Sequence, residues 1–236
     1  MSNEITVRPE NSIATPTTGY GIEGMEDMGQ EDMILPRYSI VQPTSKGTGD
    51  TEPGWFWNNL AKEAVNAVFA VILRVNHTRT LWSGDLADKT PECSSYDGIT
   101  GRTYGTCAGC QFNAWGGKEV KYCKQGYMFL CTDPSSGEKF MIGAMGTSVR
   151  PAKLLISQFM NKRRSPFSAV IKFLTAKVEG DKGKYWVLNP SIYKWLEPHE
   201  VTGFRDEYVA MARVNIKEVE IEEGAVPPPT LSEDDF

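Results

Sequence analysis

Four of the five cysteines fall in one short part of the chain, where they could bind a single metal ion. Cys93, Cys107, Cys110 and Cys123 follow the spacing C-x13-C-x2-C-x12-C. The central pair places two thiolates one tight turn apart, so both can bind the same tetrahedral ion, and the outer cysteines complete four ligands. Four thiolates that leave no open position suit Zn²⁺ in a structural role, and metal binding would then supply much of this segment's folding energy.

Other interpretations of these cysteines stay open. They could be buried reduced thiols, they could hold an iron–sulfur cluster with the same four ligands, or the central pair could be a redox motif. His77 could replace one ligand, although it could equally be an ordinary surface or core residue. Cys131 lies in an apolar stretch, which predicts a core position.

Residues that could carry catalysis are sparse. The two histidines, His77 and His199, have no nucleophile motif near them, the glycines form no phosphate-binding loop, and no pattern of acids indicates a metal-dependent nuclease. We therefore expect a protein that is not an enzyme.

Aromatic and basic residues are interleaved in the first half of the chain, as in proteins that bind single-stranded nucleic acid. Such proteins stack bases on aromatic rings and hold phosphates with basic side chains. The candidates for stacking are Trp55, Trp57, Trp82 and Trp115, and those for phosphate contact are Arg74, Arg79, Arg102, Lys118, Lys121 and Lys124. The alternative is that most of these aromatics are core residues. The basic run Lys162 to Arg164 has two possible roles: it could be only a solvated helix end, or it could contact phosphates.

The elements that would position these residues are mostly strands. The patterns predict strands at 38–42, 55–57, 65–75, 127–131, 139–143, 167–178 and 184–188, with helices from a Ser148 cap to Arg164 and over 198–215. Within 55–57, strand alternation sends Phe56 to the face opposite the two tryptophans. Residues 76–125 are polar and glycine-rich, which indicates a loop insertion held by a metal. The fold class is therefore mainly β (α+β), and an OB-like antiparallel barrel fits it, although strand counting leaves an α+β sandwich open.

Charge divides the chain into three parts. Residues 1–36 carry a net charge of −6, residues 37–217 carry +8, and residues 218–236 carry −7. We expect a disordered acidic arm over 1–30, a nucleic-acid-binding domain over 31–222, and a flexible acidic tail over 223–236. The basic domain attracts a polyanion, and the tail can compete for the same surface. The tail ends in Glu233, Asp234, Asp235 and Phe236, which offer a partner protein an aromatic anchor beside a free carboxylate.

The location of the protein is indicated by what its sequence lacks. No apolar run reaches the roughly 18 residues that span a bilayer, and no secretory signal is visible. We expect a cytoplasmic protein with no membrane partner, in the host cell if a phage encodes it. Its thiols would stay reduced.

Two stretches of the sequence resemble a known family. They are DMILPRYSIVQPTS, from Asp32 to Ser45, and the later region that contains RTLW from Arg79, CSSYDG from Cys93, the C-x2-C pair and Trp115. Both resemble bacteriophage single-stranded DNA-binding proteins that carry a zinc-binding loop on an OB-like barrel. The resemblance covers residues 30–165. Separately, the end of the acidic tail is similar to the tails of bacterial and phage single-stranded DNA-binding proteins, which recruit replication enzymes and compete with DNA.

These observations predict a protein that coats single-stranded DNA during phage replication or recombination, with little sequence preference. Its tail would recruit replication or recombination proteins. Assembly of the protein into a homo-oligomer is also open. A zinc-loop protein that binds a host or phage protein, and so modulates transcription or defence, is the alternative. A nuclease or recombination enzyme is a third hypothesis, although the sequence contains no metal-dependent nuclease motif.

Overall fold

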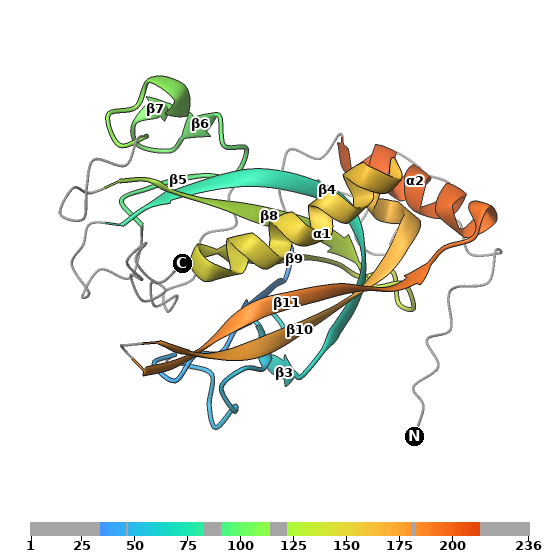
Figure 1. Ribbon diagram of the computed structural model, residues 1–236, viewed down its shortest axis with the longest axis horizontal. Coiled ribbons are helices and arrows are strands. Elements are labelled where there is room, and N and C mark those ends of the chain that lie inside the picture. The colour runs from blue at the N-terminus through green and yellow to red at the C-terminus, as the bar shows by residue number, and fades with distance from the viewer. Residues whose placement is uncertain (1–33, 46, 83–90, 114–121, 181–182, 213–236) are drawn as a thin grey trace, which may run out of the picture.

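The chain folds as a curled sheet with two helices (Figure 1). The computed structural model describes residues 34–45, 47–82, 91–113, 122–180 and 183–212. The predicted N-terminal arm and acidic tail lie outside these residues. Within them the protein is mainly β, and its large sheet curls into a half-barrel.

The large sheet has nine strands among the described residues, and eight of them form a continuous path. In spatial order these are β11 (Gly183–Trp195), β10 (Ala169–Gly180), β4 (Val68–Leu81), β8 (Lys124–Thr132), β9 (Lys139–Met145), β1 (Arg37–Ile40), β2 (Phe56–Asn58) and β3 (Glu63–Val65). The ninth, β5 (Cys93–Ser95), pairs with the far end of β4. A separate hairpin joins β6 (Thr100–Gly101) to β7 (Gly105–Thr106).

The inner face of the curl holds the larger apolar core. Phe56 from β2 and Phe173 from β10 come from strands near opposite ends of the spatial order, yet both are fully buried in one cluster. Residues so far apart across a sheet can share a core only if the sheet curls. The predicted core position of Cys131 is confirmed, because its side chain is fully buried in this cluster.

Helix α1 (Val149–Lys162) covers the inner core with Leu155 and Phe159. The helix is where the sequence predicts it, but the predicted cap is wrong. Ser148 makes no side-chain capping bond. Its hydroxyl oxygen instead accepts a hydrogen bond from the Leu188 N–H of β11 at 3.0 Å, so it ties the helix start to the sheet.

Helix α2 (Pro198–Ala212) packs against the outer face of the sheet. Phe204 and Met211 belong to a second cluster with Leu73 of β4 and Leu130 of β8. The described residues contain no helix long and apolar enough to cross a membrane.

The two edges of the half-barrel meet at a seam, which we define by Gln42, Gly54, Thr175 and Trp186. Gln42 exchanges two hydrogen bonds with the backbone of Trp186, at 2.7 and 2.9 Å. Thr175 donates its hydroxyl to the Gly54 carbonyl at 2.6 Å. Gly54 has φ +98°, and a side chain there would lie 2.3 Å from the indole nitrogen of Trp186, so only glycine fits.

Two features differ from the sequence prediction. The pairing of β1 with β9 is parallel, whereas the prediction was an antiparallel barrel. Strand β4 also continues to Leu81 instead of ending near Val75, because β5 and β8 pair with its second half. The start of the expected insertion is therefore part of the main sheet.

Candidate metal centre and nucleic-acid surface

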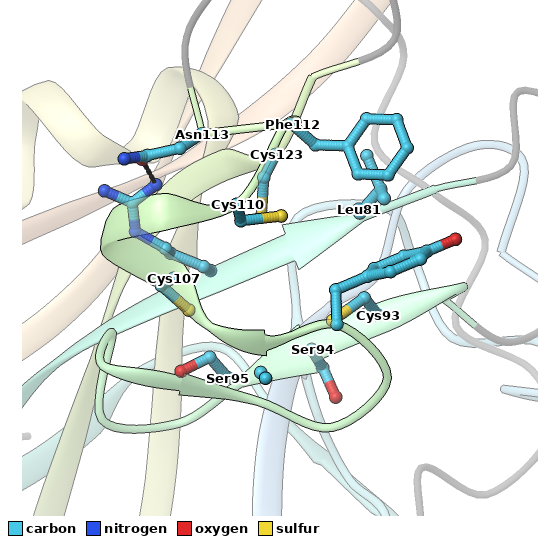
Figure 2. Close-up of a pocket in the computed structure, with 13 residues that line it drawn as sticks. Leu81, Cys93, Ser94, Ser95, Cys107, Cys110, Phe112, Asn113 and Cys123 are labelled. Carbon is cyan, nitrogen blue, oxygen red and sulfur yellow. Dashed lines mark hydrogen bonds between the residues drawn. The ribbon is translucent and has the colours of Figure 1, made fainter.

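The four clustered cysteines come from three parts of the fold and line one pocket (Figure 2). Cys93 begins β5, where it lies opposite Leu81 of β4. Cys107 opens a short 3-10 turn, and the Cys110 N–H donates to its carbonyl at 3.3 Å. Cys123 directly precedes β8. The sheet thus positions the outer two cysteines, and a tight turn positions the central pair.

Asp97 organises the loop between Cys93 and Cys107. One of its carboxylate oxygens accepts hydrogen bonds from the N–H groups of Ile99 and Thr100, at 2.7 and 2.9 Å, and from the Ser95 hydroxyl at 2.9 Å. Partial burial opposes ionisation, but the hydrogen bonds outweigh it and hold the pKa of Asp97 below its ordinary value. The carboxylate therefore folds this loop locally, without an apolar core.

A glycine leaves room beside the sulfurs. A side chain at Gly101 would lie 2.9 Å from the Cys93 sulfur and 3.8 Å from the Cys107 sulfur. The missing side chain keeps this side of the pocket open, which suits a group bound between the thiols.

The electrostatics of the pocket disfavour a free thiolate at Cys123. Burial raises the pKa of Cys123 to about 11, and the other three cysteines add to the rise, while the nearby Arg79 opposes it. Arg79 also donates a hydrogen bond to the Asn113 side chain at the pocket wall. A divalent cation would reverse this preference, because metal binding deprotonates thiols.

Four thiols around one pocket fit Zn²⁺ as a donor set. Within the described part of the chain, no group of three or more His, Cys, Asp or Glu side chains is already arranged to hold a metal ion. The fit thus rests on the identity of the donors and their shared pocket, rather than on the present sulfur positions.

The predicted stacking and phosphate residues are dispersed over the fold. Phe56 is fully buried, whereas Trp55 and Trp57 are half-buried, in agreement with the predicted alternation. Trp82 is half-buried after β4, and Arg102 is exposed between β6 and β7. Trp115, Lys118, Lys121 and the four tail residues Glu233, Asp234, Asp235 and Phe236 lie outside the described residues.

Strand register separates the basic candidates of β4 and β8. Arg74 lies opposite Leu130, and Lys124 lies opposite Thr80, which places both basic residues on the outer face of the sheet. Arg79 faces the cysteine pocket instead. Trp57 lies opposite Ser39 and so also faces outward. The structure therefore puts Trp57, Arg74 and Lys124 on one sheet face and gives Arg79 a place in the pocket wall.

Sequence reasoning missed two tryptophans that contact basic side chains. Lys177 lies over the ring of Trp186, with 5.6 Å from its amine to the ring centre. Trp195 at the end of β11 has two such neighbours, Lys162 and Arg164. Both tryptophans are half-buried in β11. Trp195 packs against the inner core, and Trp186 shares the strand face of the buried Leu188, so no pattern in the sequence set them apart from core residues.

The fold and the cysteine pocket define a class, namely a mainly β protein whose curled sheet carries a cysteine-lined loop region at one end. More particularly, the chain belongs to the family described as Pam3 phage gp34-like protein, whose model matches residues 8–206. It is thus a phage protein. No curated protein and no solved structure matches the chain.

Proposed function

We propose that this phage protein binds single-stranded DNA during replication or recombination, without catalysis and with little sequence preference. The observation that carries the proposal is the outer sheet face with the half-buried Trp57 and Lys124 and the exposed Arg74. An aromatic ring offers every base a stacking surface, and the basic side chains attract the phosphates. The curled half-barrel is compatible with an OB-like fold, which often serves this purpose.

In this proposal the cysteine pocket holds a structural zinc ion. Cys93, Cys107, Cys110 and Cys123 would be the ligands, and the ion would supply a tetrahedral cross-link between β5, the central turn and β8. The chain itself would supply the support, through Asp97 in the first loop and Arg79 at the pocket wall.

In the proposed function, the negative charge of the acidic tail lets it compete with DNA. Residues 218–236 carry seven acids and no base, and four of these acids lie in the tail, 223–236, so the tail can compete with DNA for basic surfaces in the host cytoplasm. Its end, from Glu233 to Phe236, would dock a replication or recombination protein when DNA displaces it.

Tryptophan fluorescence during titration with oligo-dT at two salt concentrations tests the proposal. We expect quenching that weakens with salt, and tighter binding by a chain truncated after residue 222. Binding should depend less on salt in Arg74→Gln. The slope of the logarithm of the binding constant against the logarithm of the salt concentration should fall in magnitude by about 0.7. Lys184→Gln is the matched control, because it removes an exposed positive charge near Glu179 at a hairpin end. Absence of binding by both the full and the truncated chain would overturn the proposal.

A specific observation favours the alternative, a zinc-loop protein that binds another protein. Ile99 and Tyr104 are large side chains on the cysteine loop, and they are 66% and 39% exposed. Exposed apolar side chains on a braced loop suit a protein partner. Salt-insensitive binding to a protein, with none to DNA, would favour this function.

A further inference from the structure

One continuous segment of the chain carries positive charge and no negative charge. Residues 139–178 contain eight Lys and Arg and no Asp or Glu, although the whole chain has a net charge of −5. The segment comprises β9, α1 and most of β10. Its charge is therefore not a general property of the protein.

Five of the eight basic residues are exposed on α1 and on the turn that ends it. They are Arg150, Lys153, Lys162, Arg163 and Arg164. Within the described ranges, none of the five forms an ion pair. By contrast, Lys139, Lys184 and Lys194 each have a glutamate within 4.0 Å. The helix thus presents basic groups whose charge is not neutralised by described neighbours.

Trp195 holds two of these basic groups at the end of the helix. The Arg164 guanidinium lies 4.8 Å from the ring centre, and the Lys162 amine lies 5.8 Å from it. Phe159 of the inner core fixes the ring edge-on, at 5.7 Å. Two cations gathered over one ring repel each other, and an anion placed between them would relieve that repulsion.

Arg163 occupies a backbone conformation that other residues adopt more easily. It follows α1 in the left-handed region, with φ 52° and ψ 39°, where glycine is the usual residue. A basic side chain is kept there despite a cost of about 1 kcal/mol. Helix-end charge accounts for part of this choice, since cations are favoured at helix C-termini. A third adjacent base is more than that role requires.

We propose that this surface, the α1 basic face, binds the phosphate backbone of single-stranded nucleic acid. The α1 basic face comprises Arg150, Lys153, Lys162, Arg163, Arg164 and Trp195. The inference rests on the proposed function and assigns it a second contact surface, on the opposite side of the sheet from Arg74. Its chemistry is that of phosphate recognition, because guanidinium groups bind phosphate oxygens through paired hydrogen bonds.

The apolar side chains of α1 argue against a hydrophobic protein interface. Leu154 and Met160 are 60% and 72% exposed. They lie six residues apart, which separates them by about 120° around the helix. They therefore do not form one patch. An acidic protein that docks through charge alone is the competing partner, and the experiment distinguishes it.

The test uses the full chain and oligo-dT, with fluorescence anisotropy measured from 50 mM to 400 mM salt. The variant combines Lys162→Gln, Arg163→Asn and Arg164→Gln, because asparagine tolerates the left-handed conformation. The control combines Lys62→Asn, Lys184→Gln and Lys194→Gln, which removes the same charge elsewhere. We expect the variant to bind at least tenfold more weakly at low salt. The slope of the logarithm of its binding constant against the logarithm of the salt concentration should fall in magnitude by about 2. The control should change little in either quantity.

The outcomes separate this inference from the proposed function. If the unmodified chain binds oligo-dT and the variant binds with an unchanged slope, the α1 basic face is not a DNA contact, although the proposed function survives. If the unmodified chain does not bind oligo-dT, both fail. Equal losses in variant and control would reduce the effect to net charge and would also overturn the inference. Thermal melting of the variant near that of the unmodified chain shows that it folds.

Discussion

The inner core of the half-barrel and the cysteine end of the same sheet are held together by different means. In the inner core, Phe129, Phe173 and Leu188 are fully buried, and α1 closes the cluster. At the cysteine end, β5, β6 and β7 are two or three residues long, and the loop rests on hydrogen bonds to Asp97 and on pocket-lining cysteines. Strand β4 runs through both regions.

This difference shows how one strand can support two kinds of stability. The first half of β4 gains from burial, which grows with the apolar area removed from water. The second half supports a short, polar loop, which hydrogen bonds to Asp97 organise and which the proposed zinc ion would cross-link. Each prediction below changes a residue of one region, so that its effects on the two regions can be compared.

Loss of the metal ligands should have the largest effect, and it should be confined to the cysteine end. We expect the purified chain to contain zinc, and Cys107→Ser with Cys110→Ser to abolish it. Structural zinc contributes about 10 kcal/mol or more to small sites. Elemental analysis measures the metal, and hydrogen exchange should show lost protection over 91–113 with the inner core intact. In the control, Cys131→Ala, zinc should stay while the core loses about 1 kcal/mol. Zinc retained by the double variant would contradict the assignment.

Phe173→Ala should destabilise the whole sheet. The side chain is fully buried and packs against Phe129 at 5.8 Å between ring centres. We expect a loss of about 3–5 kcal/mol in the free energy of unfolding, measured by urea denaturation. Tyr193→Ala is a suitable comparison, because that ring is half exposed and should cost much less. A small effect of Phe173→Ala would mean that the inner core is not the main source of stability.

Asp97→Ala should loosen the first cysteine loop by about 1 kcal/mol, since it removes three hydrogen bonds at an exposed site. The folded pKa of Asp97 is depressed, so its contribution is present above the unfolded pKa and is lost as pH falls through the folded pKa. Exchange rates of the Ile99 and Thr100 amides measure the effect. Asp97→Asn keeps one acceptor oxygen, so its amide exchange rates should lie between those of the unmodified chain and those of the alanine variant. Unchanged amide exchange in the alanine variant would show that the carboxylate does not organise the loop.

Arg163→Gly should give the smallest effect and the opposite sign. Glycine relieves the left-handed strain but removes a favourable charge at the helix end, which leaves a gain of about 0.5 kcal/mol. Lys62→Gly is the matched control, because Lys62 also has a positive φ, of 56°. Both variants should melt slightly higher, and only Arg163→Gly should weaken DNA binding. A lower melting temperature for Arg163→Gly would place its main role in the helix cap.

Local patterns predicted much of this fold. The alternation at Phe56, the two hairpins and both helices are confirmed, because each depends on residues close in sequence. The parallel pairing of β1 with β9 could not be predicted, since it joins strands about a hundred residues apart. Ser148 was misassigned for the same reason, because its partner is in β11.

In the candidate site, too, the features set by residues close in sequence were predicted and the long-range ones were not. Spacing alone grouped the four cysteines, and the structure places all four around one pocket. The basic candidates could not be assigned to faces, because the β4 bulge near Leu73 changes which residues point outward. The place of Arg79 in the pocket wall depends on that register.

The seam closes the half-barrel through side chains. In a closed barrel, strand number and shear fix the radius. Here hydrogen bonds from Gln42 and Thr175, rather than a backbone ladder, join the two edges. Closure of the half-barrel at the seam therefore depends on a few side chains, so substitution of Gln42 or Thr175 should loosen the seam without breaking a strand pairing among the described residues.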